Sequence, residues 1–239
     1  MPTTALVTGA NRGLGLEWVR QLADTVDHLY ATCRRPAAAD DLQALAEAHP
    51  DTVTVLGLDV TDDDAIADAV ERVRREQGAL HLLVNNAGVS GGATSDRFGS
   101  VDAETMTEVL RVNAVGPHLM TQAFAELLTA GADDRGTATV VNVTSQLGSI
   151  ERTSGGGWHS YKASKAALNM GTRLQAAELK GNDVIVVAMH PGWVRTDMGG
   201  SNARLSTEES VTSMLDVIDD LQLSHTGQFL AYDGDELPW

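Results

Sequence analysis

The sequence is poor in the residues that mark several common classes of protein. Its 239 residues include one cysteine, Cys33, which excludes an intramolecular disulfide framework and a zinc site built from several cysteines. No apolar run approaches the roughly 20 residues that span a bilayer, and the N-terminus lacks the charged and apolar regions of a signal peptide. The histidines show no metal-ligand spacing. We therefore expect a soluble, cytoplasmic chain with no membrane span and no catalytic metal.

Basic residues are scarce as well. There are 17 Lys and Arg against 33 Asp and Glu, a formal net charge of −16 at pH 7, and the lysines are Lys162, Lys165 and Lys180. A surface this negative repels phosphate backbones, which argues against nucleic-acid binding through a basic face. We interpret the excess of acidic residues as a solvated surface.

Apolar stretches of strand length alternate with helical patterns along the whole chain. The strands are expected at Thr4–Thr8, His28–Cys33, Thr52–Leu58, Leu80–Val84, Thr137–Thr144, Val184–Met189 and Gln228–Ala231. The helices are expected at Leu14–Ala23, Asp40–Ala48, Asp62–Glu76, Asp102–Leu128, Tyr161–Leu179 and Thr207–Leu221. This alternation predicts an α/β fold, a single doubly wound Rossmann-type domain over residues 1–239 with a mostly parallel seven-stranded sheet. Such sheets bind ligands at the carboxyl ends of their strands.

A glycine-rich turn, TGANRGLG at residues 8–15, lies between the first strand and the first helix. Glycine permits a tight turn and a close backbone approach, and the N-terminus of a helix offers unpaired N–H groups to a phosphate. The turn therefore predicts a dinucleotide site. Its binding residues are expected to be Gly9, Asn11, Arg12, Gly13, Leu14 and Gly15.

Arg34 and Arg35 end the second strand, where an acidic residue would bind the ribose 2′-hydroxyl of NAD(H). Guanidinium groups instead suit a 2′-phosphate, and Arg12 in the glycine turn is placed to reach the same phosphate. These arginines favour NADP(H) over NAD(H) as the cofactor. The alternative is that they are ordinary surface residues.

Tyr161 and Lys165 are four residues apart and therefore share one face of a predicted helix. A free phenol with a pKa of about 10 is a poor acid or base at neutral pH. A nearby cation favours the phenolate, so Lys165 is expected to lower the pKa of Tyr161. Such a pair is common by chance, and further motifs must support it.

Those motifs occur in the order found in one enzyme family. They are the glycine turn, Asn85-Asn86-Ala87-Gly88, Ser145, Tyr161-x-x-x-Lys165 and Pro191-Gly192. Because these motifs are spread along the sequence, essentially the whole chain resembles the short-chain dehydrogenase/reductase family. SQLGSI at 145–150, YKASKAALNM at 161–170 and YDGDELPW at 232–239 add a likeness to the sniffer-type carbonyl reductases and their C-factor-like bacterial relatives.

The resemblance implies four catalytic residues. Tyr161 would protonate the carbonyl oxygen in reduction, and Ser145 would hydrogen-bond that oxygen. Lys165 would hold the nicotinamide ribose, and Asn113 would organise a proton-relay water near the lysine. Ser145 lies sixteen residues before Tyr161, a wider spacing than in most family members, whereas Ser149 lies twelve before it. We choose Ser145 because it directly follows a predicted strand.

The resemblance also implies further contacts. The remaining cofactor-binding residues would be Asp59, Val60, Asn85, Ala87, Gly88, Tyr161, Lys165, Pro191, Gly192, Val194 and Thr196. Specificity is expected from Gln146, Leu147, Trp158, His159, Trp193, Met198 and residues 89–93, with the tryptophans forming either pocket wall or core. His190 ends a buried strand and is expected to be a hydrogen-bonded core residue.

Three functions compete. The leading hypothesis is hydride transfer between NADP(H) and a small carbonyl or alcohol substrate, in the direction of aldehyde or ketone reduction. The family resemblance also implies a homodimer or homotetramer that is joined through helices 102–128 and 161–179. The alternative is a cofactor-binding regulatory or signalling protein with little turnover, against which the complete catalytic set argues. An epimerase or dehydratase fits poorly, because the chain lacks room for the larger C-terminal substrate domain of those enzymes.

Overall fold

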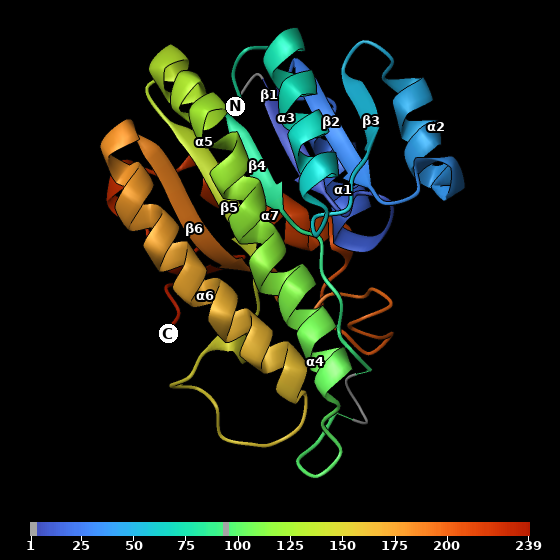
Figure 1. The fold of residues 1–239 in the computed structure, drawn as a ribbon, viewed down its shortest axis with the longest axis vertical. Coiled ribbons are helices and arrows are strands. Elements are labelled where there is room, and N and C mark those ends of the chain that lie inside the picture. The colour runs from blue at the N-terminus through green and yellow to red at the C-terminus, as the bar shows by residue number, and fades with distance from the viewer. Residues whose placement is uncertain (1–3, 93–95) are drawn as a thin grey trace.

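One seven-stranded sheet forms the centre of the fold in the computed structural model, which describes residues 4–92 and 96–239 (Figure 1). The strands are β1 (Thr4–Thr8), β2 (His28–Cys33), β3 (Val53–Gly57), β4 (Leu82–Asn85), β5 (Ala138–Val143), β6 (Val184–His190) and β7 (Phe229–Ala231). Their order is β3-β2-β1-β4-β5-β6-β7, and each neighbouring pair is parallel. The predicted doubly wound α/β fold is confirmed, and these seven strands are parallel throughout.

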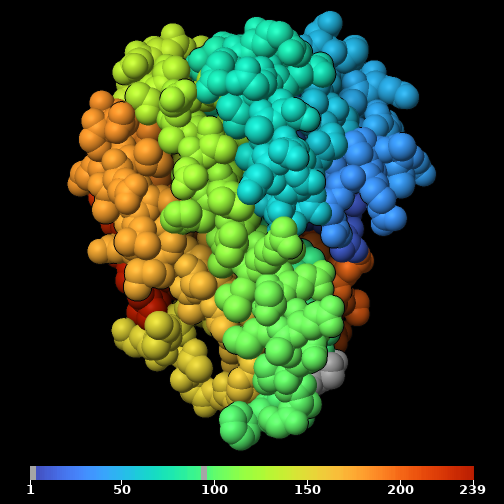
Figure 2. Space-filling view, in the orientation of Figure 1, coloured from blue at the N-terminus to red at the C-terminus, as the bar shows by residue number. Residues whose placement is uncertain are grey.

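Helices cover both faces of the sheet. On one face lie α1 (Gly13–Leu22), α2 (Asp40–Ala48) and α7 (Thr207–Asp219); on the other lie α3 (Asp63–Glu76), α5 (Gly116–Arg135) and α6 (His159–Leu179), with α4 (Ala103–Leu110) preceding α5. Figure 2 shows α3, α5 and α6 side by side on the second face. Among the described residues, no helix combines the length and the apolar character that crossing a membrane requires.

Alternating side chains along each strand divide the core into two layers. In β1, Ala5 and Val7 pack in the layer beneath α1, α2 and α7, whereas Leu6 packs in the layer beneath α3 and α5. Successive strand residues point to opposite faces, so a strand that is covered on both sides must be apolar at nearly every position. This explains why β6 reads as the continuous apolar run VIVVAM before its final histidine.

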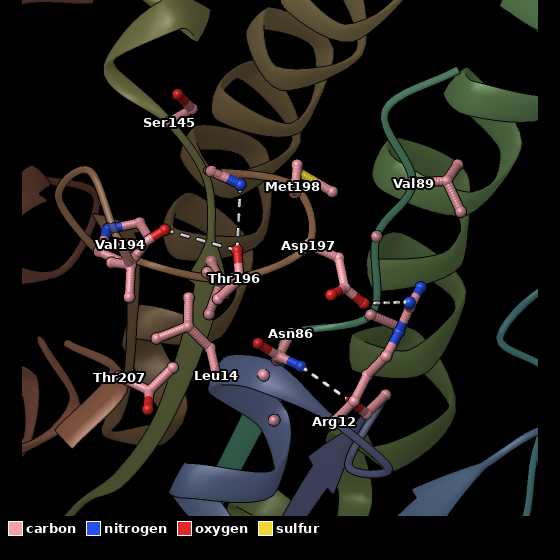
Figure 3. Close-up of a pocket in the computed structure, with 18 of the residues that line it drawn as sticks. Arg12, Leu14, Asn86, Val89, Ser145, Val194, Thr196, Asp197, Met198 and Thr207 are labelled. Atoms are coloured by element: carbon pink, nitrogen blue, oxygen red, sulfur yellow. Dashed lines mark hydrogen bonds and ion pairs between the residues drawn. The ribbon is translucent and has the colours of Figure 1, made fainter. Parts of the chain in front are cut away.

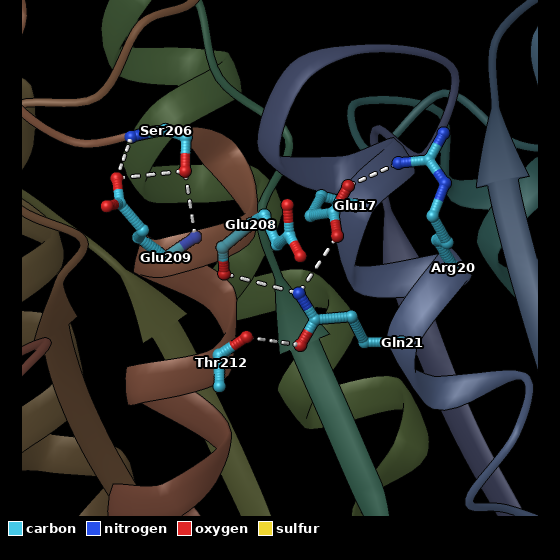
Figure 4. Close-up of polar contacts among 7 residues, drawn as sticks. All are labelled: Glu17, Arg20, Gln21, Ser206, Glu208, Glu209 and Thr212. Atoms are coloured by element: carbon cyan, nitrogen blue, oxygen red, sulfur yellow. Dashed lines mark hydrogen bonds and ion pairs between the residues drawn. The ribbon is translucent and has the colours of Figure 1, made fainter.

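Polar side chains fix the start of α7 against α1 (Figure 4). Ser206 caps α7 reciprocally: the Glu209 N–H donates to Ser206 Oγ (3.0 Å), and the Ser206 N–H donates to Glu209 Oε2 (2.7 Å). Gln21 of α1 donates to the Glu208 carbonyl (3.2 Å) and accepts from Thr212 Oγ1 (3.1 Å). The helix that follows β6 is thereby held by the helix that follows β1.

The helix expected at 102–128 is not one regular helix. It divides into α4, a π-helical turn at Arg111–Val115 and α5, which runs on to Arg135 and ends at Gly136 in the left-handed conformation (φ +88°). The π turn contains Asn113, whose side-chain amide is hydrogen-bonded to both backbone groups of Val89. Single π turns of this kind are frequent at functional sites.

Gly131 of α5 lets the helix approach the backbone before β4. A Cβ at this position would lie 2.2 Å from the Leu80 carbonyl oxygen. We expect Gly131→Ala to lower the free energy of unfolding by about 1–3 kcal/mol, because backbone atoms cannot move aside as a flexible side chain can. Gly181→Ala is the control, since nothing lies within 4 Å of a Cβ there. Urea denaturation measures both variants, and equal midpoints would contradict this packing.

Candidate active site

A cavity of about 910 Å³ opens where the central strands end (Figure 3). Its wall includes the glycine turn after β1, the ends of β2, β5 and β6, the segment after β4, and the first turns of α6. Parallel strands direct their carboxyl ends to a common edge, which is why segments so distant in sequence meet here. The volume lies within the range of about 300–1,000 Å³ that is usual for cofactor and small-molecule sites.

The glycine turn forms a cradle that has no room for a side chain at Gly9 or Gly15. A Cβ on Gly15 would lie 2.1 Å from the Gly9 carbonyl oxygen, and one on Gly9 would lie 2.8 Å from Ala87 Cα. The first turn of α1 has no side-chain cap and no acidic residue. Its N–H groups and the positive end of the helix dipole are therefore available to an anion, and the turn fits the pyrophosphate of a dinucleotide.

Asn86 is a structural support of this cradle that the sequence reasoning missed. Its Nδ2 donates to the Thr8 carbonyl (2.9 Å), and its backbone N–H donates to Thr8 Oγ1 (3.0 Å). The side chain also lines the cavity. Asn86 is the second residue of the motif Asn85-Asn86-Ala87-Gly88, so the sequence did contain a signal for it. The family resemblance, however, implied cofactor contacts only for the other three residues of the motif.

The predicted arginine cluster is only partly brought together. Arg12 and Arg34 line the cavity, whereas Arg35, which precedes the short 3₁₀ turn at Pro36–Ala38, does not. Arg12 forms an ion pair with Asp197 (2.7 Å), and Figure 3 shows the two side chains meeting across the cavity. Both side chains are largely exposed, so this pair contributes little stability and leaves Arg12 free to exchange partners.

A row of polar contacts, here called the β5–α6 seam, joins the end of β5 to α6. The Lys165 ammonium donates to the Val143 carbonyl (2.8 Å), and Thr144 Oγ1 donates to Asn169 Oδ1 (2.8 Å). Asn142 donates to Thr172 Oγ1 (3.0 Å) and Gln175 Oε1 (2.9 Å). All of these side chains are buried, so each bond satisfies groups that water cannot reach.

The seam places Tyr161 and Lys165 together beneath the cavity surface. The Lys165 Nζ lies 5.8 Å from the centre of the Tyr161 ring. Burial lowers the pKa of Lys165 to about 8 and raises the pKa of Tyr161 to about 12, with a hydrogen bond to Ser145 opposing the latter shift. The pKa of Tyr161 therefore lies above its ordinary value and not below it, as the nearby charge of Lys165 alone would predict, because desolvation of the phenol is the largest influence. Tyr161 keeps its proton at neutral pH, as a proton donor must.

Ser145, and not Ser149, reaches the cavity. Ser145 begins the 3₁₀ turn Gln146–Gly148, and its Oγ accepts a hydrogen bond from the Leu147 N–H (3.1 Å). Ser149 is also buried, but its Oγ accepts from the Arg152 N–H (3.1 Å) and does not line the cavity. A wall with Ser145 and Tyr161 offers two hydroxyl groups to one oxygen atom of a bound molecule.

Asn113 and Asn85 lie behind the cavity wall. Asn113 is fully buried, and its amide bonds Val89 and donates to Ser164 Oγ (3.0 Å), which ties the β4 segment to α6. Asn85 donates to Asn142 Oδ1 (2.9 Å) and so extends the seam toward β4. Neither asparagine lines the cavity, so the relay role of Asn113 and the cofactor contact of Asn85 stay predictions.

Most of the other predicted residues line the cavity. The cofactor-binding residues that do so are Gly9, Asn11, Arg12, Gly13, Leu14, Gly15, Arg34, Asp59, Val60, Ala87, Gly88, Tyr161, Lys165, Pro191, Gly192, Val194 and Thr196. The specificity residues that do so are Val89, Gln146, Leu147, Trp158, Trp193 and Met198; His159 does not, and Ala93 lies outside the described residues. His190 lines the cavity as well, and its Nδ1 has no hydrogen-bond partner, so the expected bonded core histidine is corrected.

Comparison with known proteins identifies the family. The sequence profile described as short chain dehydrogenase matches residues 3–205, most of the chain. The chain belongs to the short-chain dehydrogenase family.

Solved structures and curated proteins resemble the chain over much of its length. The carbonyl reductase Sniffer of D. melanogaster has a TM-score of 0.95 at 33% identity and covers 100% of both chains. The NADPH bound carbonyl reductase from chicken fatty liver has a TM-score of 0.93 at 37% identity and covers 100% of this chain and 99% of that one. The C-signal of Myxococcus xanthus is 43% identical over 68% of this chain and 94% of its own.

The lysine of the seam gives a direct test of the site's electrostatics. With three lysines in the sequence, NMR of the protein labelled with ¹³C-lysine yields few signals. We expect the Lys165 signal to titrate with a pKa of about 8, because its burial disfavours the charged form. That signal should disappear in Lys165→Met. Titration of every lysine above about pH 10, the ordinary range, would contradict the buried position.

Proposed function

We propose that this short-chain dehydrogenase is an NADP(H)-dependent carbonyl reductase that acts on aldehydes or ketones. The observation that carries the proposal is that Ser145, Tyr161 and Lys165 line the same cavity as the glycine turn. The carbonyl reductase neighbours, one of them with bound NADPH, add support. A second support is the chemistry of the wall, which combines an anion cradle with a buried proton donor.

The cofactor half of the cavity would bind NADPH through the glycine turn. The uncapped start of α1 would hold the pyrophosphate, and Arg34, with Arg12 released from Asp197, would hold the 2′-phosphate. The Lys165 ammonium would hold the nicotinamide ribose. When bound, NADPH supplies the hydride. The seven strands of the described residues form one sheet, which supports a single NADP(H)-binding domain.

The catalytic half would supply the proton. The Tyr161 hydroxyl donates its proton to the carbonyl oxygen while the hydride reaches the carbonyl carbon, which gives the alcohol and leaves a phenolate that solvent protonates again. Ser145 Oγ donates a hydrogen bond to the same oxygen and fixes its position. Lys165 stabilises the phenolate as the charge develops, since its ammonium lies near the ring.

Removal of the Tyr161 hydroxyl tests this assignment. We expect Tyr161→Phe to lower the rate of NADPH oxidation with a ketone by about 10²–10⁴-fold, because the proton donor is lost, while NADPH binding persists. Tyr30→Phe is the control, because the Tyr30 hydroxyl bonds Glu76 (3.0 Å) and lies outside the cavity. Absorbance of reduced nicotinamide measures the rates, and similar rates for Tyr161→Phe and the wild type would refute the role of Tyr161.

Cofactor choice provides a separate test. We expect Arg34→Ala to raise the KM for NADPH about tenfold or more and to leave the KM for NADH nearly unchanged, because the variant loses a guanidinium contact to the 2′-phosphate. Arg35→Ala should change the NADPH-to-NADH ratio less, because Arg35 does not line the cavity. A wild-type preference for NADH would overturn the assignment of both cavity arginines.

The second candidate function is that of a cofactor-binding signalling protein. The identity to the C-signal of Myxococcus xanthus favours it. The retained Ser145, Tyr161 and Lys165 argue against it, because a protein that only binds the cofactor needs no proton donor. NADPH binding without turnover across a broad panel of aldehydes and ketones would favour this candidate.

We also propose that the chain forms a homodimer or homotetramer through α4, α5 and α6. Met170 and Leu174 are more than half exposed and lie one turn apart on α6, and Val115 in the π turn is nearly half exposed. Apolar side chains grouped on neighbouring elements are typical of surfaces that bind another protein chain. The cytoplasmic location expected from the sequence stays a prediction.

A further inference from the structure

The helix that carries Tyr161 begins without a side-chain cap of its own. By contrast, α3, α4 and α7 are each capped by the side chain of the preceding residue, which is Asp62, Asp102 or Ser206. The residue before α6 is Trp158, whose side chain has no oxygen, and the first turn of α6 holds no acidic residue. Backbone N–H groups in a first helical turn lack partners within the helix. The start of α6 therefore depends on a group from another segment.

Asp96 supplies that group. Its Oδ2 accepts a hydrogen bond from the Ser160 N–H (2.6 Å), although the two residues are 64 positions apart in the sequence. Both residues are buried, and the positive end of the helix dipole favours a carboxylate at this place. The Phe98 ring also packs near the His159 ring, with centroids 6.4 Å apart. Residues 96–98 are thus held to the first turn of α6, and Figure 1 shows both at the same end of the molecule.

Trp158, which directly precedes this turn, has a strained backbone. Its φ of +57° lies in the left-handed region, where Asp183 is the only other non-glycine residue among those that the structure describes. Aspartate adopts this region readily, whereas a bulky residue there is an outlier that persists only when its surroundings enforce it. The Trp158 carbonyl accepts a hydrogen bond from the Lys162 N–H (2.8 Å). The strained residue is therefore tied to the same helical turn that Asp96 holds.

This conformation accompanies a ring contact with the proposed proton donor. The Trp158 and Tyr161 rings meet edge to face, with centroids 5.7 Å apart and planes inclined by 71°. Both side chains line the cavity, whereas Asp96 does not. The indole therefore forms the cavity wall next to Tyr161, where an aromatic side chain offers a large apolar contact. Backbone strain that is kept at such a place points to a function in the site.

We propose that Asp96 is a positioning residue that holds Trp158 against Tyr161 and so shapes the wall that the substrate contacts. Without its carboxylate, the buried Ser160 N–H loses its partner, the first turn of α6 loosens, and Trp158 relaxes from the left-handed conformation. Tyr161 itself stays anchored through Lys165 in the β5–α6 seam. Loss of Asp96 therefore weakens substrate binding more than it slows the chemical step. The effect on the substrate rests on the proposed carbonyl reduction.

Kinetics with acetophenone and NADPH test this role. We expect Asp96→Ala to raise the KM for acetophenone about fivefold, because an aromatic wall contact is lost, and to change kcat and the KM for NADPH by less than about twofold. Asp96→Asn keeps an oxygen that can accept from the Ser160 N–H, so it should restore most of the wild-type KM. Asp62→Ala is the matched control, because it removes the cap of α3 outside the cavity. Thermal unfolding checks that the variants fold.

A double variant tests whether Asp96 acts through Trp158. Trp158→Ala should raise the KM for acetophenone by as much as Asp96→Ala does, and the double variant should differ from either single variant by less than about twofold. Two independent effects that multiply in the double variant would overturn the proposal. A loss of kcat at unchanged KM in Asp96→Ala would overturn it as well, because the aspartate would then act on the chemical step.

¹⁹F NMR of the protein labelled with fluorotryptophan tests the contact without turnover. The sequence has four tryptophans, and Trp158→Phe identifies the Trp158 signal. We expect Asp96→Ala to move this signal toward its position in the urea-unfolded protein and to leave the Trp18 and Trp239 signals in place, whereas Asp96→Asn moves none of them. An unmoved Trp158 signal in Asp96→Ala would reject the role of Asp96. A wild type that oxidises no NADPH with any ketone would instead reject the proposed reductase, and a moved Trp158 signal would still support the positioning contact.

Discussion

Close packing of α6 on the end of β5 is the constraint on which the candidate site depends. The Lys165 ammonium is bonded to the Val143 carbonyl, and a Cβ on Gly148 would lie 2.8 Å from the Lys165 backbone carbon. The helix therefore has little freedom to slide along the strand, and Tyr161, one turn before Lys165, is fixed near Ser145. The buried amides of Asn142 and Asn169 bond across the same seam and resist its separation.

A second close contact fixes the other half of the cavity. Gly9 approaches Ala87 so closely that no side chain fits between them, and Asn86 bonds the carbonyl of Thr8. The backbone amides at the start of α1 are thus held at the same edge of the sheet as the seam. In the proposed function, this common edge holds the anion cradle and the proton donor on rigid elements. The flexible dinucleotide and the substrate are then oriented by binding to groups that are already in place.

The fold was predictable from the sequence because its signals are local and repeated. Most residues of each strand are apolar, and the glycine turn, Tyr161 and Lys165 lie near predicted strand or helix ends. The π turn at Asn113 was not predictable, because it depends on bonds to Val89, which lies far away in sequence. The direction of the Tyr161 pKa was missed for a similar reason: spacing reveals a neighbouring charge but not the burial that outweighs it. His190 likewise had no pattern that marked a missing partner.

The central claim of this account is that one cavity delivers a hydride and a proton to the same carbonyl group. NADPH that carries deuterium at both C4 positions of the nicotinamide tests it most directly, with mass spectrometry of the alcohol formed from a ketone. The account predicts one deuterium on the carbinol carbon of the wild-type product and at most trace product with Tyr161→Phe. An alcohol without deuterium on that carbon would contradict direct hydride transfer in this cavity.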